Sequence, residues 1–124
     1  AQSRLTAPDA VSEYGWDSRW TWRKWRSGIA ECFGHQEDSG VSVTSAWGNL
    51  YDSTQEYGKI AYPSGLFAAE PVVNVTVRSV PNSVMMEWWS QGSKAETPIW
   101  LYVRPTPASD LTVTANIYAV GRWK

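Results

Sequence analysis

The chain has 124 residues, a length that suits one domain with a single hydrophobic core. Apolar residues make up 43% of the chain and charged residues 19%, a composition typical of a globular protein rather than a disordered one. Lysine and arginine number 11 against 12 acidic residues, and this net charge of −1 argues against a general binder of nucleic acids or anionic membranes.

The single cysteine, Cys32, excludes a disulfide within the chain, and together with His35 it is too small a ligand set for a structural zinc ion. We therefore expect no metal and no cofactor. No run approaches 18 consecutive apolar residues, so we expect no membrane span. Nine tryptophans are the unusual feature, and they indicate an aromatic core, a subunit interface or a surface that stacks on a ligand.

The first residues differ in character from the rest of the chain. Residues 1–15 contain Pro8 and Gly15 and show little periodicity, so we expect them to form a connector that leads from an upstream stalk. The domain itself is expected to span residues 16–124 as a single β-sandwich head.

The segment WTWRKWRSG, from Trp20 to Gly28, is compatible with two structures. On a helix Trp22 and Trp25 would share a face, whereas on a strand Trp20 and Trp22 would do so. Tryptophan and threonine favour strands, and a helix here would be short because glycines flank it on both sides. Arg-Ser-Gly at 26–28 also matches a hairpin turn in which glycine takes a positive φ. We therefore predict a strand followed by a tight turn.

Short runs with a period of two dominate the rest of the chain. Alternation predicts strands within residues 40–47, 71–80, 83–90, 97–105 and 111–120. The predicted core faces of the clearest two runs consist of Val73, Val75 and Val77, and of Leu111, Val113, Ala115 and Ile117. Strands at about ten-residue spacing predict an all-β sandwich or barrel, and we expect an antiparallel β-sandwich, for which a jelly roll and an H-type-lectin-like arrangement are both open.

Three phrases, taken in order, resemble one protein family. They are EYGWDSRWTWRKWRSGIAECFG at 13–34, YPSGLFAAEPVVNVTV at 62–77 and IYAVGRWK at 117–124. Their combination resembles the C-terminal receptor-binding domains of tail-fibre and minor tail proteins of phages and prophages. In that family a Trp-x-x-x-Lys-Trp-x-Ser-Gly-Ile-Ala strand pair opens the domain and a Gly-Arg-Trp-Lys tail closes it. Phe33 stands where the family often has tryptophan.

The resemblance implies a homotrimeric, lectin-like β-sandwich head, similar to H-type lectins, that follows a tail-fibre stalk and recognises a glycan on the host cell surface. It also implies a place on the virion tail, after synthesis in the bacterial cytoplasm. A purely structural tip domain, which trimerises the fibre and has no ligand, is the alternative. Neither function involves nucleic acid or membrane insertion.

Aromatic residues supply the candidates for glycan recognition, because flat rings stack on sugar rings and a guanidinium donates hydrogen bonds to hydroxyls or carboxylates. In the strand within 97–105, the predicted core face consists of Ile99, Leu101 and Val103, and the predicted ligand face of Trp100, Tyr102 and Arg104. The alternative is that this second face packs against another sheet or a neighbouring subunit.

Two other segments contribute candidates. Trp88 and Trp89 are adjacent, so a strand would point them to opposite faces, one toward the core and one toward an interface or a ligand. The segment 48–58 is predicted to be a loop, and its Tyr51, Asp52 and Tyr57 are of the types that suit sugar recognition. The alternative is an ordinary polar connection.

The one histidine lies among carboxylates that include Glu31, Glu37 and Asp38. No spacing within this group matches a catalytic or metal-binding motif. We therefore expect no catalytic residues and no enzymatic activity.

Overall fold

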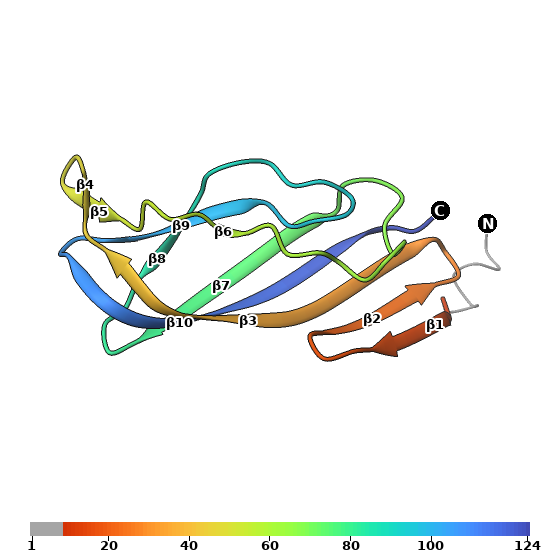
Figure 1. Ribbon diagram of the computed structural model, residues 1–124. Helices are drawn as coiled ribbons and strands as arrows, with labels where there is room; N and C mark the ends of the chain where they lie inside the picture. Colours follow the sequence, from red (N-terminus) through yellow and green to blue (C-terminus); the bar gives the residue numbers. More distant parts are fainter. Residues whose placement is uncertain (1–8) are drawn as a thin grey trace.

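The computed structural model describes residues 9–124, and every helix or strand assigned in this range is a β-strand. The strands form two antiparallel sheets that pack together, which confirms the predicted β-sandwich (Figure 1). Over the same range, no helix is long and apolar enough to cross a membrane.

The first sheet has the strand order β1-β2-β3-β10-β7. These strands are β1 (Val11–Trp16), β2 (Trp20–Trp25), β3 (Ile29–Val43), β10 (Ala108–Arg122) and β7 (Val72–Val80). The two long strands, β3 and β10, lie at the centre, with Phe33 opposite Tyr118 in their register. In Figure 1 this sheet forms the lower layer.

The second sheet is built around β9 (Ile99–Arg104). One edge of β9 pairs with β5 (Leu50–Asp52) and β6 (Tyr57–Gly58), and the other edge pairs with β8 (Met85–Trp88). The short β4 (Ser45–Trp47) completes the sheet by pairing with β5 at the end of the molecule far from the C-terminus (Figure 1).

The segment WTWRKWRSG forms β2 and a tight turn, as predicted. The backbone N–H of Gly28 donates to the carbonyl of Trp25 over 3.0 Å, and Gly28 has a φ of 101°. Because this φ lies in the left-handed region, glycine is the residue that takes it without strain. The turn delivers the chain directly into β3.

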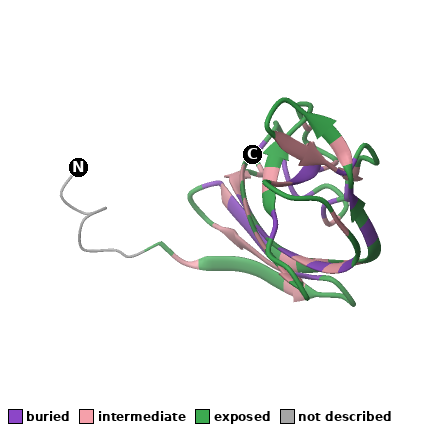
Figure 2. Ribbon diagram, turned by 90° about the vertical axis from the view of Figure 1, so that its left-hand side faces the viewer, coloured by how far each residue is buried: buried purple, intermediate pink, exposed green. Residues whose placement is uncertain are grey.

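The first strand begins inside the segment predicted to be a connector. Residues 1–8 of that segment lie outside the described residues, and β1 starts at Val11 and pairs with β2. Five of its six residues are exposed, and in Figure 2 the strand that follows the grey segment is almost entirely green. A strand with neither face in the core shows no hydrophobic alternation, which explains why the periodicity did not reveal it.

Both ends of the described chain are attached to the turn at 26–28. At the N-terminal end, the Asp9 carboxylate accepts hydrogen bonds from the backbone N–H and the hydroxyl of Ser27. At the C-terminal end, Trp123 donates its backbone N–H to Gly28 and its indole N–H to Trp25, each to a carbonyl.

The core lies between the two sheets and is rich in aromatic side chains. The predicted core face of β10 is confirmed, because Leu111, Val113, Ala115 and Ile117 are all buried. The valines at 73, 75 and 77 in β7 also pack against the core. Figure 2 shows the buried residues, in purple, on the strands of both layers.

Trp20 connects the sheets to a loop as well as filling space. Its side chain is 3% exposed, and its indole N–H donates to the carbonyl of Ala61 over 2.8 Å. Its ring also lies 5.9 Å from that of Tyr62. The Trp20 side chain thus fills space in the core and also satisfies the Ala61 carbonyl, in the connection after β6.

Replacing Trp20 by alanine tests this role. We expect Trp20→Ala to lower the free energy of unfolding by about 3–5 kcal/mol, because it leaves a cavity and an unpaired carbonyl. Trp16→Ala is the matched control, since Trp16 is 69% exposed and its loss should change stability by about 0.5 kcal/mol or less. Urea unfolding measures both, and equal losses would contradict the assignment of Trp20 to the core.

Candidate functional site

The structure corrects the prediction that Trp100 and Tyr102 face a ligand. Both side chains are 0% exposed and point into the core between the sheets. The opposite face of β9 is also covered, with Leu101 and Val103 only 7% and 4% exposed. When both faces of a strand are buried, the alternation of residue types along its sequence does not indicate which face is outward. Trp100 and Tyr102 are packing residues.

The remaining predicted residues on and beside β9 and β8 differ in how much they contact the rest of the protein. Arg104 is half-buried and donates hydrogen bonds to the carbonyls of Ser83 and Thr106, which hold two loops. Trp88 packs edge-on against Trp100, with ring centroids 6.0 Å apart, and remains 42% exposed. Trp89 is 60% exposed. The prediction that one of the two adjacent tryptophans is buried is therefore wrong.

The segment 48–58 is not simply a loop, because it contains β5 and β6. Tyr51 packs against the core, and the Asp52 carboxylate accepts a hydrogen bond from the backbone N–H of Thr54. The ring of Tyr57 packs against that of Tyr102, with centroids 4.7 Å apart and ring planes tilted by 38°. It also lines a polar cleft of about 370 Å³, beside Asp38. The predicted site residues therefore do lie close together around β9, but most of them stabilise the second sheet.

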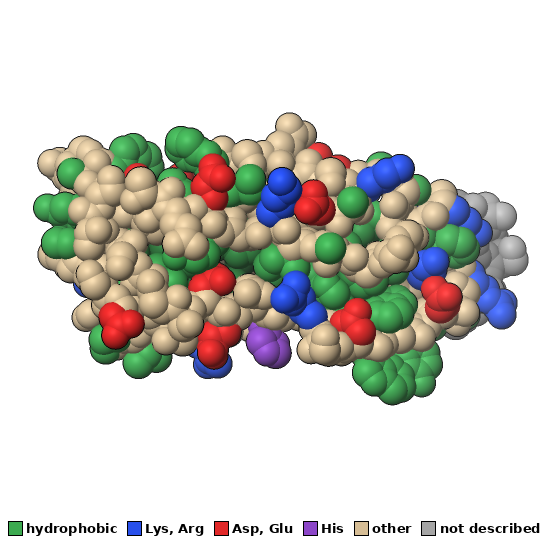
Figure 3. All heavy atoms as spheres, in the orientation of Figure 1, with side chains coloured by type: hydrophobic (Ala, Val, Ile, Leu, Met, Phe, Trp, Pro, Cys, Tyr) green, Lys and Arg blue, Asp and Glu red, His purple; other side chains and the backbone are tan. Residues whose placement is uncertain are grey.

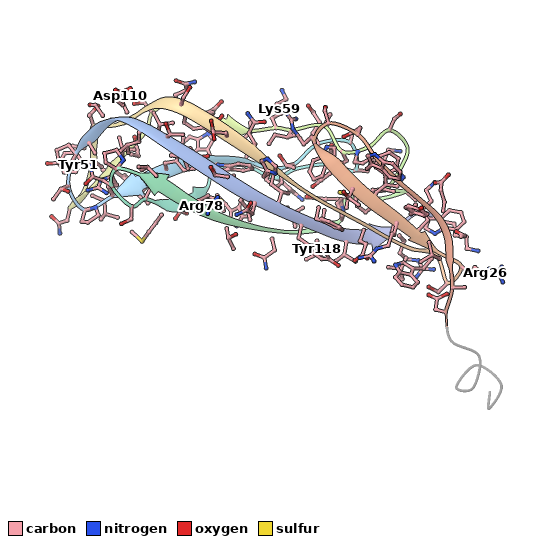
Figure 4. The ribbon with its side chains drawn as sticks, turned by 90° about the horizontal axis from the view of Figure 1, so that it is seen from below. Arg26, Tyr51, Lys59, Arg78, Asp110 and Tyr118 are labelled. Carbon is pink, nitrogen blue, oxygen red and sulfur yellow. The ribbon has the colours of Figure 1, made fainter. Side chains whose placement is uncertain are left out.

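A different surface combines exposed aromatic and polar side chains: the outer face of the first sheet. Directly opposite residues in an antiparallel pair point to the same face, so the strand register places side chains in rows. One row crosses all five strands and consists of Trp16, Thr21, Phe33, Tyr118 and Asn74. We call these five residues the aromatic row. Figure 4 looks onto this face, with Tyr118 and Arg78 labelled.

A shallow depression of about 460 Å³ lies over the β3, β10 and β7 part of this face. Phe33 and Tyr118, which are 39% and 41% exposed, supply its aromatic surface. Its polar lining comes from His35, Asn74, Thr76 and Asn116. All six side chains lie on strands of a continuous sheet, so their positions relative to one another are set by backbone pairing.

Glu31 holds the aromatic surface in place. Its side chain is 12% exposed and forms an ion pair with Arg23, with a distance of 2.9 Å between Nη2 and Oε1. The other carboxylate oxygen accepts a hydrogen bond from the hydroxyl of Tyr118. The Arg23 guanidinium also lies 5.9 Å from the ring centroids of Trp25 and Phe33. One carboxylate therefore orients a ring and a cation at the same time.

The hydrogen bond to Glu31 has a measurable electrostatic consequence. It raises the pKa of Tyr118, and partial burial and the negative charge of Glu31 add to the effect. All three favour the neutral phenol over the phenolate. The folded-state pKa of Tyr118 therefore lies above the unfolded value of about 10. The contribution of this hydrogen bond to the stability of the folded protein is present below that pH and is lost as the pH rises through the folded-state pKa.

We expect Glu31→Gln to lower the pKa of Tyr118. The amide carries no charge to oppose the phenolate, and Arg23, freed from its ion pair, would favour it. Ultraviolet absorbance of tyrosinate, followed against pH, measures the change, and Tyr118→Phe identifies which step in the titration belongs to Tyr118. An unchanged Tyr118 step in Glu31→Gln would show that this hydrogen bond does not form in solution.

Sequence reasoning detected parts of this surface and missed the whole. The alternation in β7 and β10 marks Asn74, Thr76, Asn116 and Tyr118 as lying opposite the core face. Their proximity depends on the pairing of β10 with both β3 and β7, which joins residues far apart in the chain. No local signal in the sequence specifies that pairing.

This surface offers two aromatic rings, two amides, an imidazole and a threonine hydroxyl for contact with a ligand. Among residues 9–124 there is no group of three or more His, Cys, Asp or Glu side chains that could hold a metal ion. Cys32 is buried in the core, and burial raises the pKa of its thiol to about 12. No family model, curated protein or solved structure matches the chain.

Proposed function

We propose that this chain is a carbohydrate-binding domain and that the outer face of its first sheet holds the glycan. The observation that carries the proposal is the depression lined by two half-exposed aromatic rings, two amides, a histidine and a threonine. Aromatic rings stack on the apolar faces of sugar rings. Amides both donate and accept hydrogen bonds, so they match hydroxyl groups, which do the same.

The rigidity of the surface favours binding. Each lining side chain lies on a paired strand, and Glu31 orients Tyr118 through a hydrogen bond. A ligand therefore does not have to order a loop, which is a common cost of association. The depression is shallow, so a single site would bind weakly, and several copies on one particle would raise the overall avidity.

The resemblance in the sequence supports a biological setting for this activity. The phrases at 13–34, 62–77 and 117–124 are similar to those of receptor-binding domains on phage and prophage tail fibres. In that setting the domain would attach the virion tail to a glycan of the host cell surface, as a homotrimer at the end of a stalk. The proposed role is recognition without catalysis.

The two exposed rings provide the direct test. We expect Phe33→Ala and Tyr118→Ala each to weaken glycan binding about tenfold, equivalent to about 1.4 kcal/mol, because each removes a stacking surface. Tyr118→Phe should retain most of the affinity if the ring, rather than the hydroxyl, makes the contact. A glycan array with host wall polysaccharides selects the ligand, and isothermal titration then measures Kd.

Trp47→Ala is the control for this test, because Trp47 is a 49% exposed tryptophan on β4 of the other sheet. Its Kd should match that of the unaltered protein. Equal binding by Tyr118→Ala and the unaltered protein would remove the site from this face. Failure of the unaltered protein to bind any glycan would contradict the proposed function.

The structural alternative is supported by a separate feature. Large apolar side chains are exposed on and beside β7 and β8, edge strands of the two sheets: Val72, Val80, Met85 and Trp89. Exposed apolar groups of this kind favour contacts between subunits. Light scattering on the purified chain tests the trimer that both functions include, with the mass of three chains expected and the mass of one chain contradicting it. The glycan array separates the two functions, because the structural alternative has no ligand.

A further inference from the structure

We propose that the glycan site is extended and takes an internal segment of a linear, uncharged polysaccharide, which lies across the strands from β7 to β1. This inference rests on the proposed function, and it names the class of ligand. It adds Tyr14 and Trp16 of β1 to the binding surface. Neither residue lines the depression over β3, β10 and β7.

The aromatic row runs across the strands rather than along them. Its five residues are directly opposite one another across β1, β2, β3, β10 and β7. At a strand spacing of about 4.8 Å, the row extends roughly 19 Å from Asn74 to Trp16. This length exceeds a single sugar ring several times over. A ligand that touched the whole row would therefore be an oligosaccharide lying perpendicular to the strands.

The two aromatic rings on β1 are largely exposed. Trp16 is 69% exposed and Tyr14 is 66% exposed, and the two rings stack on each other with centroids 6.0 Å apart. They belong to the outer face because the residue between them, Gly15, faces the core-side ring of Trp22. Figure 3 shows hydrophobic side chains protruding from the lower surface at this end of the molecule.

The strand that bears these rings is held by its turn and by its neighbouring strand. The Asp17 carboxylate accepts hydrogen bonds from the backbone N–H groups of Arg19 and Trp20, which fixes the turn between β1 and β2. An ion pair of 3.3 Å joins Glu13 to Lys24 across the two strands. Trp16 therefore lies on a hairpin held by these hydrogen bonds and this ion pair, directly opposite Thr21. Because threonine is small, the surface between the rings of Trp16 and Phe33 is lower than the rings themselves.

Charged side chains on this face lie beside side chains of opposite charge. Arg23 is the cation nearest the middle of the row, and its ion pair with Glu31 neutralises it. Farther along the same face, Glu37 and Arg78 both lie opposite Thr114, which gives a second balanced pair of charges. A charged polymer would gain little from such a surface. An uncharged glycan, bound through stacking and hydroxyl groups, matches it.

The aromatic row is open at both ends. It begins on β7 and ends on β1, which are the two edge strands of the first sheet. A polysaccharide can therefore continue past either edge, so the surface suits the middle of a chain rather than its terminal sugar. This distinguishes the proposed site from a closed pocket that recognises one sugar.

A series of ligand lengths tests the inference. The probes are neutral chito-, cello- and malto-oligosaccharides, from the disaccharide to the octasaccharide, with Kd measured by titration calorimetry. We expect affinity to rise with length and then to level off. Trp16→Ala should weaken binding of the longest bound oligomer about tenfold and leave the disaccharide unaffected, whereas Tyr118→Ala should weaken both.

Three outcomes separate this inference from the proposed function. If affinity does not depend on length, or Trp16→Ala changes no Kd while Tyr118→Ala does, the extended site is overturned and the glycan-binding function stands. If a charged glycan selected on the array binds more tightly than the neutral series, and its Kd rises steeply with salt, the assignment of an uncharged ligand is overturned. If none of the three series binds, the inference is overturned, and the glycan array then decides the proposed function separately. Trp47→Ala again serves as the control tryptophan.

Discussion

The pairing of β3 with β10 is the constraint on which the rest of this molecule depends. These two 15-residue strands form the centre of the first sheet, and β2 and β7 pair with their outer edges. Their register therefore aligns all five strands. A slip of β10 by one residue against β3 would turn Tyr118 into the core and bring Ala119 to the surface. The same register thus decides both the core and the outer face.

Glu31 shows how a surface of this kind is kept in one arrangement. A carboxylate that is largely removed from water is costly unless it is paired and hydrogen-bonded. Arg23 and Tyr118 satisfy it from the strands on either side of β3. In return, both side chains lose rotational freedom before any ligand arrives. The polar contact therefore contributes to shape as well as to charge balance.

Strands with one buried face were the most predictable part of the fold. β7 and β10 alternate cleanly, and their core faces are those expected from the sequence. β9 was identified as a strand, but its outward face was assigned wrongly because both of its faces are covered. β1 escaped detection for the opposite reason, since almost all of it is exposed. Alternation is informative only when the two faces of a strand differ in burial.

The candidate site was less predictable than the fold because it depends on pairing between distant segments. Trp16 and Tyr118 are separated by about a hundred positions, yet the register of three strand pairs puts them in one row. The aromatic residues that the sequence made most prominent, Trp100 and Tyr102, were used to fill the core. Composition identified the importance of aromatic side chains, whereas topology decided which of them remain accessible.

The turn at 26–28 has a consequence for the connectivity of the domain. Asp9 and Trp123 both attach to it, so the two ends of the described chain leave the sandwich at one point. A domain whose ends meet in this way can be inserted into a surface loop of another protein, or be circularly permuted through a short linker, without unpairing its central strands. The opposite end of the domain, with β4 and β5, would then project freely from the protein into which the domain is inserted.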